Sequence, residues 1–357
     1  MHHLACSLFS KGHQVHVLYS KYPHEQFNVE VPYEIHWVHH YNFATINLNI
    51  FSFANVLGPL AEKEKFNVIH GNAEEAYWTG KIAKRNKSIY VFTSHTPNIP
   101  ITGMLKGMMK PVRFLKSLNT YLLRQGIIEA DQVVALSQFS RDLIIKGINN
   151  TCANKIKVIS PGIESSWFEV KRKPSSGLGL LFWGRIEEEK GLRELFHALK
   201  TVTKMVNDVS LTIVGEGNRL REYKSLVADL SLTGRVEFTG WLCSTKIQNL
   251  AARSSLGIFP SRVESFGLSV VEAMAAGLPV IAASGGAVPE NIEQDVTGTL
   301  VPVNDEDALA MAIIFILENV QHAESMAKEA KKVVQQKFTW DKAANNMIDL
   351  YEMHSDK

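Results

Sequence analysis

Short apolar segments alternate with stretches of helical periodicity along almost the whole chain of 357 residues. Each apolar segment has the length of a strand that is buried on both faces, and turn-forming residues bound it. Strands and helices that alternate in this way form parallel sheets, because each helix carries the chain back across the sheet. This pattern predicts an α/β protein.

The apolar segments form two groups, which predict two doubly wound, Rossmann-like domains. The expected strands are 14–19, 34–38, 68–70, 89–94, 132–135 and 157–159, then 178–183, 210–214, 236–238, 255–259 and 279–282. Between the groups lies the polar segment 171–177, which is rich in turn formers. We place the boundary between Pro161 and Gly177, which gives an N-terminal domain over 1–165 and a C-terminal domain over 166–338.

The composition excludes several classes of protein. Hydrophobic residues make up 45% and charged residues 21% of the chain, as is usual for a globular protein, and a formal charge of +2 argues against general nucleic-acid binding. The three cysteines are scattered and form neither a disulfide framework nor a zinc-binding spacing. No apolar run reaches the length of a membrane span, and the start lacks the apolar core of a signal peptide. We therefore expect a cytoplasmic protein.

Two carboxylates, Glu264 and Glu272, flank a glycine turn that leads from an apolar strand into a helix. The free N–H groups at the start of that helix, around Phe266, Gly267 and Leu268, form an anion site. Carboxylates suit sugar and ribose hydroxyls because they accept two hydrogen bonds at once. The alternative is a solvated loop glutamate together with a glutamate that the helix dipole favours.

A second motif, Gly184-Arg185-Ile186-Glu187-Glu188-Glu189-Lys190-Gly191, follows the strand at 178–183. Arg185 can grip a phosphate through two hydrogen bonds, and Lys190 adds a compact charge. A leaving diphosphate needs such neutralisation. The alternative is a weak surface pair of Lys190 with Glu187 or Glu188. We favour ligand binding, because both motifs follow strands of one predicted sheet at the edge where such sheets bind ligands.

The two motifs resemble the donor-site motifs of the family 4 retaining glycosyltransferases, which have the GT-B fold. Further matches follow in order at 134–137, 159–163, 214–217, 238–240, 285–290, 295–298 and 338–340, so the resemblance covers nearly the whole chain. It implies that a hexosyl group passes from a nucleotide-diphosphate-sugar co-substrate to a hydroxyl of a glycan, a lipid-linked or a small-molecule acceptor, with no further cofactor. It also implies a place in cell-envelope polysaccharide or glycolipid synthesis.

The resemblance also implies roles for single residues. Glu264 would hold the donor sugar and stabilise positive character at the anomeric carbon, and Glu272 would hold the ribose hydroxyls. His95 would lie beside the donor sugar and the acceptor. Three glycines would lie near the nucleotide: Gly184, Gly215 and Gly217. The helix at 339–357 would cross back to the first domain.

The N-terminus departs from the family pattern. Helical spacing begins at Leu4, whereas family members usually have a strand and a glycine-rich loop before this helix. The first strand of a doubly wound sheet is central, so its loss would leave the neighbouring strands unpaired. We therefore expect a truncated or misassigned start and reduced activity.

The remaining polar and charged segments are weaker candidates for a functional site. Asp305-Glu306-Asp307 opens a helix, where acidic residues act as caps, and the cluster of His36, His39 and His40 lacks a fixed metal geometry. We therefore expect no metal. The basic, amphipathic segment 103–124 could contact anionic lipid, or it could be an ordinary solvated surface. A nucleotide-sugar epimerase and a non-catalytic, nucleotide-sugar-binding remnant stay open as alternative functions.

Overall fold

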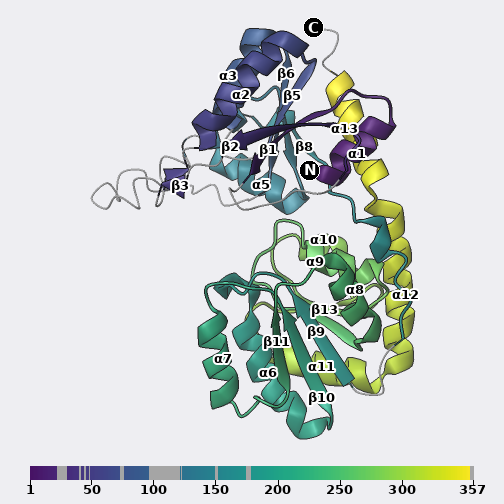
Figure 1. Cartoon of the computed structure of the whole chain (residues 1–357). Coiled ribbons are helices and arrows are strands. Elements are labelled where there is room, and N and C mark those ends of the chain that lie inside the picture. The colour runs from purple at the N-terminus through teal and green to yellow at the C-terminus, as the bar shows by residue number, and fades with distance from the viewer. Residues whose placement is uncertain are drawn as a thin grey trace. The chain divides into compact units, whose positions relative to one another are not determined.

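The computed structural model describes residues 1–21, 30–39, 42–43, 46–47, 49–72, 76–95, 121, 123–148, 152–173 and 178–353. The chain forms two compact units, one made of Met1–Gly162 with Trp340–Lys357 and the other of Ile163–Thr339. Both units contain parallel sheets with helices packed on them (Figure 1). The predicted α/β class is therefore confirmed.

The second unit is built on a six-stranded sheet in the order β11-β10-β9-β12-β13-β14, and every pair is parallel. Strand order reverses between β9 and β12, the point at which doubly wound sheets bind ligands. The strands are β9 (Leu178–Trp183), β10 (Val209–Val214), β11 (Val236–Gly240), β12 (Leu256–Phe259), β13 (Val280–Ala283) and β14 (Thr299–Val301).

Helices cover both faces of this sheet (Figure 1), because right-handed connections that run in opposite directions along a sheet lie on opposite faces. The residues of β12 and β13 are therefore all buried, and the strands read as continuous apolar runs. The helices are α6 (Leu192–Met205), α7 (Leu220–Asp229), α8 (Ser244–Arg253), α9 (Leu268–Ala275), α10 (Val288–Asn291), α11 (Glu306–Glu318) and α12 (Val320–Lys337), and the short 3₁₀ turns are Ser165–Trp167 and Glu188–Lys190.

The first unit contains a four-stranded parallel sheet, β5-β6-β7-β8, and a separate parallel pair, β1-β2. Within the described residues, β1 pairs only with β2, and β5 pairs only with β6. These strands are β1 (His16–Lys21), β2 (Glu34–His39), β5 (Val68–Gly71), β6 (Ile89–Ser94), β7 (Gln132–Ala135) and β8 (Ile156–Val158), and two short antiparallel strands are β3 (Asn42–Phe43) and β4 (Ile46–Asn47).

The C-terminal helix α13 (Trp340–Glu352) belongs to the core of the first unit. Its buried residues Ala344, Met347 and Leu350 pack with Leu4 and Val91. The ring of Trp340 stacks on His3, and Lys11 forms an ion pair of 2.6 Å with Asp341. Among the residues that the structure describes, this unit also contains α1 (His2–Ser10), α2 (Asn49–Glu64), α3 (Ala76–Asn86), α5 (Gln138–Gly147) and the 3₁₀ turn Ala153–Lys155.

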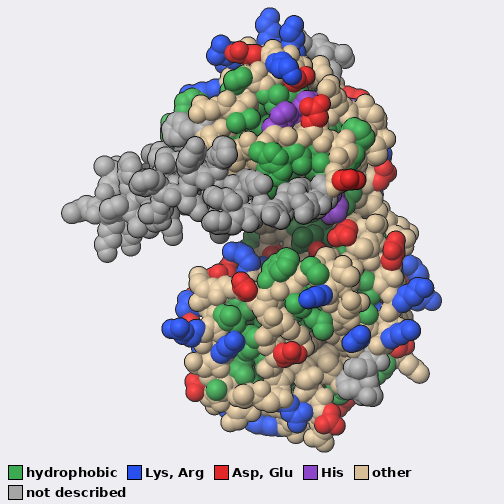
Figure 2. Space-filling model, viewed as in Figure 1, with side chains coloured by type: hydrophobic (Ala, Val, Ile, Leu, Met, Phe, Trp, Pro, Cys, Tyr) green, Lys and Arg blue, Asp and Glu red, His purple; other side chains and the backbone are tan. Residues whose placement is uncertain are grey.

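The surface carries both signs of charge. On the visible face of the second unit, Lys and Arg side chains are interspersed with Asp and Glu (Figure 2). A nucleic-acid-binding surface instead gathers basic side chains on one face. None of the helices described here is both long and apolar enough to cross a membrane. The predicted lipid-binding segment lies, up to residue 120, outside the described residues.

Candidate functional site

The glycines after β9 and β10 allow two turns to pack backbone against backbone. The N–H of Gly184 donates to Val214 O at 3.1 Å, and the N–H of Ile186 donates to Glu216 O at 2.8 Å. A Cβ at Gly215 would lie 2.0 Å from Gly184 O, and one at Gly217 would lie 2.2 Å from Ile186 O. Close packing therefore accounts for these glycines, and their contact with a nucleotide stays a prediction.

The turn at Gly191 joins the loop after β9 to the loop after β12. Gly191 has φ 68°, and a Cβ there would lie 2.0 Å from Pro260 O. The N–H of Arg262 donates to Glu189 O at 2.8 Å, which fixes the two loops side by side. Lys190 and Glu264 are thereby brought together from opposite sides of the switch point.

Lys190 and Glu264 form an ion pair, with Nζ 2.6 Å from Oε1. Both side chains are largely buried, with 15% and 20% of their surface exposed. They line a small recess together with Ser261, Gly267 and Ser269. Among the described residues, Lys190 forms no ion pair with Glu187 or Glu188, so the alternative of a weak surface pair is wrong.

Gly285 and Gly286, in the loop after β13, pack against the backbone of the loop that carries Glu264. Gly286 has φ 63°, and a Cβ there would lie 2.3 Å from Glu264 O. A Cβ at Gly285 would lie 2.5 Å from Arg262 O, and the N–H of Ala287 donates to Glu264 O at 2.9 Å. Only glycines allow this approach, so the 285–287 loop sets the position of Glu264. This role could not be inferred from the sequence motif at 285–290, because it depends on which loops touch.

The recess borders the start of α9, where backbone N–H groups are available. Gly267 is the residue before the helix, with φ 84°, and no side chain caps the helix there. Phe266 is buried against Phe338, and the side-chain amide of Asn291 donates to Phe266 O. The turn around Phe266, Gly267 and Leu268 is thus held by packing while its helix start stays open to an anion.

Glu272 lies one turn further along α9 and is held by Trp183. The indole Nε1–H of Trp183 donates to Glu272 Oε2 at 2.8 Å. Burial raises the pKa of Glu272 to about 7, although the bond from Trp183 acts in the opposite direction. Trp183 in turn stacks on Trp167, with ring centroids 5.6 Å apart. Trp183 was not predicted as a site residue, although its place at the carboxyl end of β9 was a signal.

Two protein-family models match this chain and together cover residues 1–333. The family model described as "Glycosyltransferase Family 4" matches residues 1–167, and the model described as "Glycosyl transferases group 1" matches residues 164–333. The chain belongs to the family 4 glycosyltransferases. The resemblance proposed from the motifs is therefore confirmed.

Known relatives of this glycosyltransferase match it along most of its length. An uncharacterised glycosyltransferase of Methanocaldococcus jannaschii is 27% identical over 98% of this chain and 92% of its own. Sucrose-phosphate synthase from Thermosynechococcus elongatus has a TM-score of 0.81 at 21% identity, over 98% of this chain and 91% of its own. HepE of Anabaena, solved in complex with UDP-glucose, has a TM-score of 0.72 at 21% identity, over 90% and 86%. These likenesses confirm the GT-B fold.

Arg185 of the glycosyltransferase lies outside the recess in this structure. Its side chain is 71% exposed and forms an ion pair of 2.9 Å with Glu189, four residues along the chain. A pair as exposed as this one contributes little to stability, so Arg185 is free to change partners. Its contact with a diphosphate stays a prediction.

Arg262 is a supporting residue that the sequence analysis missed. Its guanidinium lies 2.6 Å from Glu194 and 3.5 Å from Glu188. Glu188 precedes Lys190 by two residues, and Arg262 precedes Glu264 by two. The Arg262 side chain therefore ties together the loops that carry the ion pair.

His95 lies in the first unit, directly after β6, whereas the other predicted site residues lie in the second unit. It is exposed, and its Nε2 is 3.2 Å from Asn72 Oδ1. His70 has a structural role, with ring nitrogens 2.8 Å from Tyr351 Oη and 2.7 Å from Thr93 Oγ1. Burial lowers the pKa of His70 to about 3, so this imidazole is neutral at physiological pH.

The acidic run at 305–307 is a helix cap, as the sequence predicts. The Asp305 carboxylate accepts a hydrogen bond from the N–H of Ala308 at 2.8 Å at the start of α11. Glu306 and Asp307 occupy the first turn, where the helix dipole favours negative charge.

Proposed function

We propose that this glycosyltransferase moves a hexosyl group from a nucleotide-diphosphate-sugar donor to an acceptor hydroxyl with retention of configuration at the anomeric carbon. The observation that carries the proposal is the partly buried ion pair of Lys190 and Glu264 beside the uncapped start of α9, at the switch point of the sheet. A cation, a carboxylate and free N–H groups meet there, as an anionic sugar donor requires.

In this proposal the diphosphate binds Lys190, Arg185 and the N–H groups around Phe266, Gly267 and Leu268. These groups neutralise the charge that grows on the leaving diphosphate, so the reaction proceeds without a metal ion. The UDP-glucose complex of HepE supports a nucleotide-sugar donor, because that protein shares the fold.

Binding of the diphosphate releases Glu264 from Lys190. Glu264 then accepts hydrogen bonds from the donor sugar and stabilises positive character at the anomeric carbon. Glu272, held by Trp183, accepts hydrogen bonds from the ribose hydroxyls. The leaving phosphate helps to deprotonate the acceptor on the same face of the sugar, and His95 assists beside the acceptor.

The acceptor is a hydroxyl of a glycan, a lipid-linked or a small molecule, and the reaction serves cell-envelope polysaccharide or glycolipid synthesis at the cytoplasmic face of the membrane. No cofactor besides the donor is needed. Segment 103–124 would provide any contact with the lipid.

The test is product formation from UDP-, GDP- and ADP-sugars with a panel of acceptors, in the presence of a chelator. We expect transfer with one donor and a loss of about 100- to 1,000-fold in kcat for Glu264→Ala, the usual effect of removing one stabilising group. Binding of a donor without turnover by the wild type would instead indicate a non-catalytic protein. A product formed without an acceptor would indicate an epimerase or hydrolase.

A further inference from the structure

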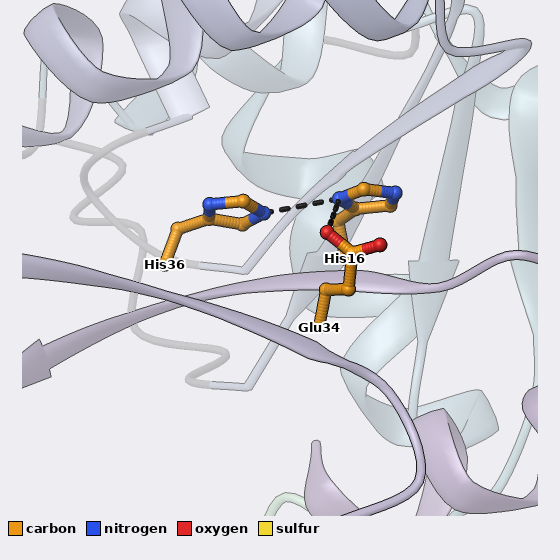
Figure 3. A group of neighbouring side chains, drawn as sticks. All are labelled: His16, Glu34 and His36. Carbon is orange, nitrogen blue, oxygen red and sulfur yellow. Dashed lines mark hydrogen bonds and ion pairs between the residues drawn. The ribbon is translucent and has the colours of Figure 1, made fainter.

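A second group of convergent side chains lies in the first unit. His16 lies on β1, and Glu34 and His36 lie on β2, which pairs with β1 so that His16 is opposite Glu34. Because side chains alternate along a strand, Glu34 and His36 share one face of the pair. Figure 3 shows the three side chains directed toward a common point.

The distances between the ligand atoms fit a metal ion. His16 Nδ1 lies 3.0 Å from His36 Nε2 and 3.4 Å from Glu34 Oε2 (Figure 3). Each of the three residues offers one ligand atom that lies within 4.8 Å of the ligand atoms of the other two. A tetrahedral zinc ion, bound at about 2.0–2.2 Å, holds its ligand atoms about 3.4 Å apart. The distance from His16 Nδ1 to Glu34 Oε2 equals this value, and the two imidazole nitrogens lie somewhat closer together.

Packing holds the central imidazole in place. The His16 side chain is 3% exposed, its ring lies parallel to and beside that of His36, and it packs against Phe66 with ring centroids 4.9 Å apart. Within the described residues its Nε2 is buried without a hydrogen-bond partner, so Nδ1 makes the polar contacts of this ring. Glu34 is 62% exposed and opens the group to solvent.

Hydrogen bonding alone leaves this group poorly satisfied. If the proton of a neutral His16 is on Nδ1, that proton faces both His36 Nε2 and Glu34 Oε2. If His36 Nε2 carries the proton and donates to Nδ1 instead, Nδ1 has no proton for Glu34. A divalent cation would accept a lone pair from each of the three atoms. Two imidazoles and one carboxylate are also a donor set that suits zinc.

We propose that His16, Glu34 and His36 bind one divalent metal ion of the zinc type, with water completing its coordination. His36 was rejected as a ligand because the cluster of His36, His39 and His40 lacks a fixed metal geometry. The strand pairing supplies His16 and Glu34 instead. The ion would link β1 to β2. A sheet of only two strands has marginal stability by itself, so a bound ion would stabilise the first unit by mass action.

The test is calorimetric titration of the chelator-treated, full-length protein with Zn²⁺ alone, together with the thermal midpoint. We expect one ion per chain and a midpoint that rises with zinc. Glu34→Gln and His36→Gln should each weaken binding by more than about 100-fold, because even outer-shell partners account for 10- to 100-fold. His16 is left unchanged, because its buried ring also contributes packing.

Two controls separate this site from adventitious binding. His13→Gln removes an exposed histidine close to β1, and Cys6→Ser removes a thiol that lies 3.8 Å from His2. Both variants should bind zinc like the wild type. The proposal is overturned if the wild type shows no saturable binding, if Glu34→Gln and His36→Gln keep wild-type affinity, or if Cys6→Ser alone abolishes binding.

Discussion

Lys190 and Glu264 neutralise each other at 2.6 Å in a recess that is largely closed to solvent. Removing one partner of such a pair leaves a buried charge without compensation. A diphosphate that binds Lys190 takes the place of Glu264 as its partner, and the Glu264 carboxylate then needs new hydrogen-bond donors, which the sugar hydroxyls would supply in the proposed reaction. Donor binding at this site therefore depends on the residues that position the carboxylates of Glu264 and Glu272.

Trp183 is predicted to be a positioning residue for Glu272. Trp183→Phe keeps an aromatic ring to stack on Trp167 but removes the N–H that donates to Glu272. We expect the KM for the donor to rise about tenfold, the usual value of a hydrogen bond to a charged group, while kcat changes less. The matched control is Trp241→Phe, because Trp241 is 72% exposed. Equal donor KM values in all three proteins would contradict this role.

The carboxyl group of Glu272 predicts a pH dependence of stability. Burial raises its pKa from 4.5 to about 7, so between these values the folded protein binds more protons than the unfolded chain. Stability must then fall as pH rises through this window, by about 1.4 kcal/mol per pH unit. Urea unfolding of the wild type and Glu272→Gln at several pH values measures the difference. The free energy of unfolding of the wild type minus that of Glu272→Gln should fall as pH rises from 4.5 to about 7. If this quantity stays constant or increases with pH, the assignment is contradicted.

At the scale of elements, loops after successive strands are joined by backbone contacts that only glycine allows. Gly191 brings the β9 loop against the β12 loop, and Gly286 brings the β13 loop against Glu264. The side chain of Arg262 adds ion pairs across the same junction. The site is thus positioned by close contacts between loops rather than by any single helix or strand.

Gly286→Ala tests this positioning. The new Cβ would lie 2.3 Å from Glu264 O at a φ of 63°, so the loop that carries Glu264 must shift. A displacement of about 1 Å can lower a rate 100-fold, and we expect kcat to fall at least tenfold. Gly234→Ala is the control, because nothing lies within 4 Å of its Cβ. Wild-type kcat in Gly286→Ala would show that this contact does not set the site.

The C-terminal helix is tied to the first unit by His70, which bonds to Tyr351 of α13 and to Thr93 of β6. Tyr351→Phe removes the partner of His70 Nδ1, at a cost of about 1–3 kcal/mol. We expect faster amide hydrogen exchange in α13. Tyr121→Phe, at a side chain that is 41% exposed, is the control. Unchanged exchange in α13 would indicate that apolar packing alone holds the helix.

At the scale of the whole molecule, strand and helix periodicity predicted the α/β class and most strands to within about two residues. The strand predicted at 157–159 is Ile156–Val158, and the one predicted at 178–183 is Leu178–Trp183. Strands of this kind can be predicted from the sequence because a strand that is buried on both faces is apolar throughout. The separate pairing of β1 with β2 was harder to foresee, because pairing partners are set by tertiary structure.

The candidate site was predicted only in part. Lys190 and Glu264 meet, and Glu272 lies on the helix that begins at the recess, as expected from strand order. Trp183, Arg262 and the Gly285-Gly286 pair were missed, because their roles depend on which loops touch. The group of His16, Glu34 and His36 was missed for the same reason, since only the register of β1 and β2 brings it together.

The central claim is that Lys190 binds the diphosphate of the donor, and that Glu264 competes with the diphosphate for Lys190. Calorimetric titration with UDP, GDP and ADP tests this claim without depending on the acceptor. We expect one nucleotide to bind the wild type and Lys204→Ala, an exposed-lysine control, with equal affinity, and Lys190→Ala about 10- to 100-fold more weakly. Glu264→Ala should bind it at least as tightly as the wild type. Equal affinity in Lys190→Ala and the wild type would contradict the account.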